Sequence, residues 1–160
     1  MYRPALEWLC DLWHAVSGNR PPLDAAALIA DDQRGWPEAP TGARAALWSA
    51  LRMVTLYHIW VAKVSGDARQ QSAAAVVRAA IATLRTEMRV RFQRSGLAAS
   101  HATDLPRALC RSPLPPDPQP ASFADIWECP GLCRVAASSS TGSSDVLVLL
   151  LSDLVPVPAP

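Results

Sequence analysis

Apolar residues recur at helical spacing in three stretches of the first 95 residues. In the first stretch they are Leu6, Leu9, Leu12, Trp13 and Val16. This spacing predicts a helix over Pro4–Val16, with Pro4 in the first turn and Gly18 as the stop. In the Pro- and Gly-rich connection that follows, Asp24 is suited to cap a short helix over Asp24–Ala30.

The second stretch predicts a helix that Thr41 caps and that runs to about Val64. Its apolar stripe consists of Leu47, Leu51, Val54, His58 and Val61. Ser65 and Gly66 then interrupt the helical pattern.

The third stretch predicts a helix from a cap at Asp67 to about Arg94, ending before Gly96. Its apolar face consists of Ala73, Val77, Ile81, Leu84, Met88 and Phe92. Two long helices joined by a short break fold back as an antiparallel hairpin, and the first helix can cover the open side. We therefore expect an all-α fold over residues 1–95, a small helical hairpin plus an N-terminal helix.

The pattern changes over residues 96–160, which hold ten of the 15 prolines. Residues 113–120 favour polyproline II, and Ser138–Ser144 is typical of a flexible linker. Val146–Leu151 is apolar enough to form a strand or a helical turn. We expect this second region to be a Pro/Ser-rich, low-complexity and largely disordered tail.

Charge is distributed unevenly along the chain. Residues 41–95 carry nine Lys and Arg against two acids, a net charge of +7, whereas the whole chain has +1. At 100° per residue, Arg78, Arg85 and Arg89 lie within about 40° of one another on the third helix, and Arg91 and Arg94 lie further round. Such a stripe suits sequence-independent contact with a nucleic-acid backbone, although a solvated helix face is the competing interpretation.

No catalytic motif is recognisable, so we expect neither an enzyme nor a cofactor or small-molecule substrate. Cys129 and Cys133 form a close pair, which Cys10 and His14 would have to complete for a zinc site. Reduced cysteines without a metal are the favoured interpretation. His58 is expected to be a half-buried packing residue rather than a base.

The tryptophans offer aromatic surfaces on which bases can stack. Those within the first two long predicted helices are Trp8, Trp13, Trp48 and Trp60. Because they lie on or beside the apolar stripes, core packing is the favoured interpretation.

Residues 43–94 resemble a segment near the C-terminus of non-LTR (LINE-type) retrotransposon reverse transcriptase polyproteins. The resemblance rests on Leu47-Trp48, Leu51-Arg52 and Leu56–Trp60, followed by the Ala/Val/Arg-rich helix of Ala73–Phe92. Lys63-Val64 replaces the family's Arg-Asn step, and the upstream zinc ligands and polymerase aspartates have no counterpart. The resemblance implies a non-catalytic remnant of a retroelement polyprotein.

Two functions are therefore expected from the sequence. The first is weak, salt-dependent nucleic-acid binding by the arginines of the third helix. The alternative is a helical protein-interaction or self-association module, with Leu51, Val54, Ile81 and Leu84 as its key residues. Without a signal peptide or an apolar run of about 20 residues, an intracellular location in cytoplasm or nucleus is expected, with no membrane contact.

Overall fold

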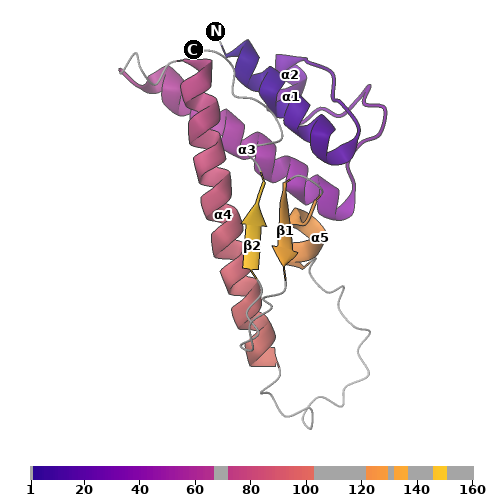
Figure 1. Cartoon of the computed structure of the whole chain (residues 1–160). Helices are drawn as coiled ribbons and strands as arrows, with labels where there is room; N and C mark the ends of the chain where they lie inside the picture. The colour runs from indigo at the N-terminus through magenta and orange to yellow at the C-terminus, as the bar shows by residue number, and fades with distance from the viewer. Residues whose placement is uncertain (1, 67–71, 103–121, 130–131, 137–145, 151–160) are drawn as a thin grey trace.

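Helices make up most of the structure, a computed structural model that describes residues 2–66, 72–102, 122–129, 132–136 and 146–150. The elements in chain order are α1 (Arg3–Ser17), α2 (Ala25–Ala30), α3 (Gly42–Val64), α4 (Ala73–Ala102), α5 (Phe123–Trp127), β1 (Cys133–Ala136) and β2 (Val146–Leu149). In Figure 1, α1 lies alongside α3, α4 runs down one side, and the two strands and α5 lie below α3. The expected all-α class is confirmed, with the small sheet as an addition.

The ends of the first two helices follow the sequence signals. Pro4 lies in the first turn of α1, and Gly18 ends the helix with a φ of 80°, donating its N–H to His14 O at 2.8 Å. Asp24 caps α2 as predicted, because its Oδ1 accepts hydrogen bonds from the N–H groups of Ala26 and Ala27. Both predicted helices are confirmed to within one residue at each end.

The predicted hairpin is formed by α3 and α4, and α1 packs against both. Thr41 precedes α3 in an extended conformation but makes no capping hydrogen bond with its side chain. The expected cap of α4, Asp67, lies outside the described residues. Instead, the described helix begins at Ala73, and Ser72 Oγ accepts a hydrogen bond from the Ala75 N–H at 3.1 Å.

The predicted end of α4 before Gly96 is wrong, since the helix continues to Ala102. Glycine inside a helix costs only about 1 kcal/mol relative to alanine, so it does not by itself end a helix. The nearest proline, the stronger helix breaker, is Pro106.

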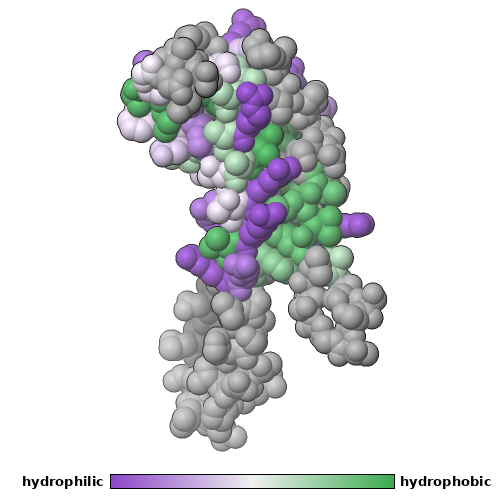
Figure 2. Space-filling model, turned by 60° about the vertical axis from the view of Figure 1, so that its left-hand side comes forward, coloured by the Kyte–Doolittle hydropathy of each residue, from purple (hydrophilic) through white to green (hydrophobic). Residues whose placement is uncertain are grey.

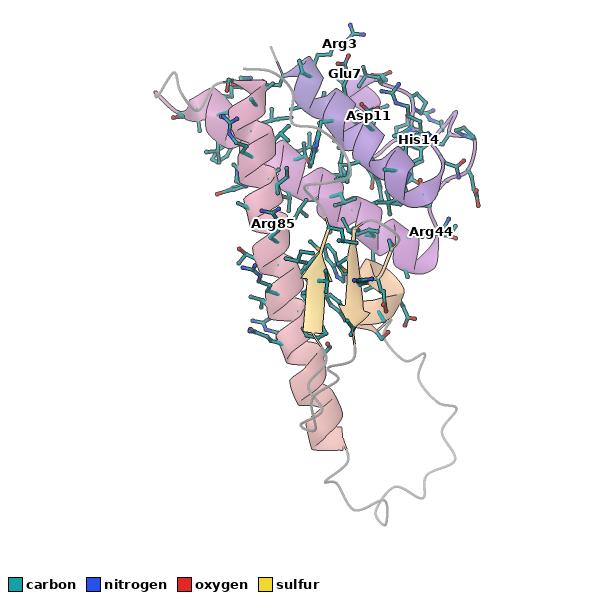
Figure 3. All side chains as sticks on the ribbon, in the orientation of Figure 1. Arg3, Glu7, Asp11, His14, Arg44 and Arg85 are labelled. Carbon is teal, nitrogen blue, oxygen red and sulfur yellow. The ribbon has the colours of Figure 1, made fainter. Side chains whose placement is uncertain are left out.

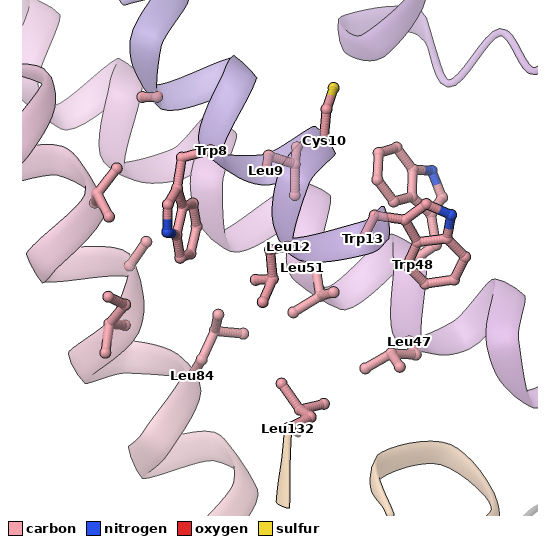
Figure 4. Packing of buried hydrophobic residues seen from close by; sticks show 14 of the residues in the cluster. Trp8, Leu9, Cys10, Leu12, Trp13, Leu47, Trp48, Leu51, Leu84 and Leu132 are labelled. Carbon is pink, nitrogen blue, oxygen red and sulfur yellow. The ribbon is translucent and has the colours of Figure 1, made fainter. Parts of the chain in front are cut away.

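The core lies where α1, α3 and α4 meet, and Figure 4 shows its side chains. Leu9, Leu12, Leu51 and Leu84 are fully buried there. Tryptophan rings close one end of this core. The Trp48 ring meets the rings of Trp13 at 5.4 Å and Trp36 at 4.9 Å in edge-to-face geometry, between ring centroids.

Polar contacts fasten α2 to α3. The buried Arg52 donates from Nη1 to the carbonyl oxygens of Leu28 at 3.0 Å and Ile29 at 2.9 Å. These carbonyls belong to the last turn of α2, where no intrahelical partner exists. Asp31 Oδ1 lies 3.4 Å from Arg52 Nε as an ion pair and accepts a hydrogen bond from Trp48 Nε1 at 3.0 Å.

Part of the region predicted as a tail belongs to the core. Phe123, Trp127, Leu132 and Cys133 are buried in the same cluster as the helical residues. The strands are antiparallel, with Cys133 opposite Leu149 and Val135 opposite Leu147, and these side chains pack on the core. Residues 96–160 are therefore not a separate tail throughout, which corrects the expected boundary after residue 95.

Three other predictions concern segments within residues 96–160. Val146–Leu151, predicted as a strand or helical turn, contains strand β2. The Pro-rich residues 113–120 and the linker Ser138–Ser144 lie outside the described residues. Within the described ranges, no helix combines the length and apolar character that a membrane span requires.

Candidate functional site

The predicted nucleic-acid contacts all lie on α4: Arg78, Arg85, Arg89, Arg91 and Arg94. Arg78, Arg89 and Arg94 are exposed, and none of them forms an ion pair with a carboxylate in the part of the chain that the structure describes. Arg85, labelled midway along α4 in Figure 3, is half-buried and has an interaction partner. Figure 2 shows hydrophilic side chains in a line along α4, beside hydrophobic side chains of the sheet.

The Arg91 side chain already contacts two residues of the chain, Glu87 and Trp127. Its Nε lies 3.3 Å from Glu87 Oε2, and its guanidinium carbon lies 5.5 Å from the centroid of the Trp127 ring. At 100° per residue it lies more than about 100° round the helix from Arg85. The five arginines are thus not gathered on one face, because Arg91 and Arg94 lie on the other side of α4.

A face that the predicted apolar stripe does not include lies on the outside of α3. Its large apolar side chains are Met53, Tyr57, Trp60 and Val64, from 54% exposed for Met53 to 61% for Val64. We call these four residues the outer stripe. They recur at i, i+4, i+7 and i+11, which places them within about 60° of one another. Water-facing helix surfaces normally carry charged or polar side chains, so an exposed apolar stripe of this kind is a candidate contact surface.

The interaction residues expected from the sequence are a different set. Leu51 and Leu84 are fully buried, Ile81 is 7% exposed, and Val54 packs against the same core. They hold α3 and α4 together and are therefore not available to a partner, which corrects that part of the expectation.

The tryptophan prediction holds for three of its four residues. Trp8, Trp13 and Trp48 are buried in the core, as expected. Trp60 is 58% exposed, so the prediction that it packs in the core is wrong.

The signal for the outer stripe is present in the sequence, because α3 is apolar on both sides. Between Arg52 and Lys63 it has no Lys, Arg, Asp or Glu.

An apolar groove of about 530 Å³ lies beside the outer stripe, between the start of α1, the segment leading into α2, α2 itself and the second half of α3. Apolar side chains that line it include Leu6, Leu23, Leu56 and Ile59. Arg3 and Lys63 also line it, and both are exposed. No carboxylate is among the described residues that line this groove.

The cysteines have the chemistry of buried thiols. Burial raises the pKa of the Cys133 thiol to about 12 and that of Cys10 to about 11, and it also raises the pKa of Cys129. Cys133 Sγ donates a hydrogen bond to Trp127 O at 3.0 Å. Within the described ranges, no three His, Cys, Asp or Glu side chains come together as a metal site would need. Cys110 lies outside these ranges.

His58 joins α3 to α4. Its Nε2 lies 2.8 Å from Thr83 Oγ1, and burial lowers the pKa of the imidazole below its usual value. The expectation of a half-buried packing residue is confirmed. A neutral His58 also leaves the middle of α3 without charge.

Comparison of the chain with protein-family models, with curated proteins and with solved structures finds no match. The resemblance of residues 43–94 to retroelement polyproteins stays a prediction.

Proposed function

We propose that this chain is a helical self-association module, in which the outer stripe of α3 packs against the same stripe of a second copy. The observation that carries this proposal is a line of four large apolar side chains, each more than half exposed, on a helix face without charge. Their alternating spacing of four, three and four residues is that of a coiled-coil seam.

The stripe is complementary to itself. In an antiparallel two-fold pairing, Tyr57 faces Trp60 of the second copy, and Met53 faces Val64 of the second copy. The rings therefore meet at the centre, where aromatic residues contribute most to association. Because no charged side chain lies within the stripe, two identical faces approach without the repulsion of like charges.

Sedimentation equilibrium over a wide range of protein concentration tests this proposal. The parent chain should associate, and Trp60→Lys should weaken association at least about tenfold, because truncating a central aromatic residue removes the main anchor. Ala82→Lys is the matched control, since it adds the same charge at an exposed position on α4. A parent chain that stays monomeric at every concentration would contradict the proposal.

A second proposal is weak, non-catalytic nucleic-acid binding, the activity that a retroelement remnant would retain. It is supported by Arg78 and Arg89, which are exposed on one side of α4 and have no carboxylate partner in the described part of the chain. Arg94, on the other side of α4, would contribute only to the general positive charge. Phosphate contacts by such side chains release counterions, so the affinity falls steeply with salt. Arg91 contributes less than the sequence suggests, because Glu87 and Trp127 already engage it.

Titration of a fluorescent single-stranded DNA at several salt concentrations tests the second proposal. Changing Arg78 and Arg89 to Ala together should reduce the salt slope by about 1.4, at roughly 0.7 per phosphate contact. The matched control changes two arginines that already form ion pairs, Arg20 and Arg34. Equal losses in both double variants would mean that only net charge matters, and this would refute a specific arginine site.

A further inference from the structure

We propose that the groove between α1, α2 and α3 binds a free long-chain carboxylate. The hydrocarbon tail lies among the apolar lining, and the carboxylate lies at the rim with Arg3 and Lys63. The volume of about 530 Å³ falls within the usual range for small-molecule sites. This site uses residues other than the outer stripe, so it is independent of the self-association proposed above.

The lining determines the kind of tail. Leu6, Leu23, Leu56 and Ile59 supply aliphatic surface from three parts of the chain: α1, the segment leading into α2, and α3. Ile29, at the edge of the groove, is 63% exposed although it is one of the large apolar residues of α2. Covering these groups with an alkyl chain removes apolar area from water, which is the main favourable term in such binding.

The rim determines the head group. Lys63 forms no ion pair with a carboxylate in the described residues, and Arg3 pairs only with Glu7, at 3.0 Å on the exposed surface of α1. A lysine can lay its aliphatic stem along an apolar wall while its ammonium group stays at the water boundary. A carboxylate at this boundary gains charge-assisted hydrogen bonds. An apolar helix of another protein would supply no carboxylate for Lys63.

Isothermal titration calorimetry with dodecanoate, below the concentration at which it forms micelles, is the test. The full chain should bind dodecanoate, and it should bind dodecyltrimethylammonium, which has the same tail with the opposite charge, at least about tenfold more weakly. Equal affinity for the two would overturn the proposal, because the groove would then recognise only an alkyl chain.

Two variants separate the head group from the tail. Lys63→Glu should weaken dodecanoate binding at least about tenfold without weakening that of dodecyltrimethylammonium. Ala25→Phe adds a ring at an exposed position that lines the groove, so it should block both ligands. Arg94→Glu at an exposed position on α4, 31 residues from Lys63, makes the same charge change as Lys63→Glu and should leave dodecanoate binding unchanged. If Arg94→Glu weakens it equally, overall charge accounts for the effect and the site is refuted.

Three further outcomes distinguish a free carboxylate in the groove from a membrane surface or a second copy of the chain. Binding to vesicles of anionic lipid without any binding of free dodecanoate would assign the groove to a membrane surface and overturn the proposal. Dodecanoate affinity that falls as protein concentration rises would assign it to a second copy of the chain, with the same consequence. Retained dodecanoate binding by Trp60→Lys would support the proposal and show that the site does not depend on the outer stripe.

Discussion

Polar side chains fasten the N-terminal helices to one another, whereas the C-terminal elements are attached to them through apolar groups and rings. In the first region, Arg52 holds the end of α2, and His58 meets Thr83 across the hairpin. In the second, the Phe123 ring meets Phe92 at 5.4 Å and Trp127 lies under Arg91. The hydrogen bonds of the first region specify how particular helices meet. The contacts of the second stabilise mainly by burial, which is not directional.

The largest expected effect comes from a chain that ends after residue 102. Phe123, Trp127 and Leu132 would leave the core, and each large apolar side chain contributes about 1.5–3 kcal/mol when buried. Their sum approaches the total stability of about 5–15 kcal/mol that domains usually have. Urea unfolding followed by circular dichroism should therefore show a much lower midpoint for the shortened chain. An unchanged midpoint would show that the C-terminal elements add nothing to stability.

Two leucines give a matched comparison of the regions. Leu84 on α4 and Leu132 before β1 are both fully buried in one cluster. Replacing either by Ala should lower the free energy of unfolding by about 2–5 kcal/mol, because it leaves a cavity as well as losing buried area. Denaturant titration of both variants measures this. If Leu84→Ala destabilises and Leu132→Ala does not, the two regions do not share a core.

Arg52→Met tests the polar attachment of the first region. The carbonyls of Leu28 and Ile29 would lose their donor, which should lower the free energy of unfolding by about 1–3 kcal/mol. The exposed Arg34, paired with Asp32, provides the control, and Arg34→Met should change stability little. If the two variants have equal stability in urea titrations, the Arg52 guanidinium does not contribute measurably to holding α2 against α3.

The smallest expected effect is a pH dependence at the hairpin. The pKa of His58 is lowered in the folded chain, so the unfolded chain takes up a proton first as the pH falls. Stability is thus unaffected above the unfolded pKa of about 6.5, and it declines as the pH drops through that value toward the lower folded pKa. Thermal melts of the parent and of His58→Gln from pH 7.5 to pH 5 measure the difference. If the melting temperatures of both proteins fall equally as the pH drops, His58 is not the cause of the pH dependence.

The contrast between the regions also explains which elements the sequence predicts. The α1, α3 and α4 helices are long enough for several apolar repeats, so their period of 3.6 stands out. By contrast, α5 has five residues and each strand four, lengths at which tertiary packing rather than local pattern decides. One local signal exists, the capping box in which Ser122 Oγ accepts from the Asp125 N–H.

The candidate sites were harder to predict than the helices for a related reason. A count of charges includes Arg52 in the basic middle and cannot show that this side chain is only 9% exposed. The predicted apolar stripe of α3 covers only its buried side, so it does not include the large apolar residues on the other side. The groove depends on residues from Tyr2 to Lys63 that meet only in the folded chain, and no spacing along the sequence marks it.

The exposed position of Trp60 gives this protein a natural optical reporter. Four of the six indoles, those of Trp8, Trp13, Trp48 and Trp127, are at most 3% exposed, and Trp36 is half-buried. A small neutral quencher such as acrylamide should therefore extinguish mainly the red-shifted emission of Trp60 and leave the shielded indoles bright. If quenching weakens at high protein concentration, the Trp60 indole on α3 becomes covered as copies of the chain associate. This measurement needs no label or substitution.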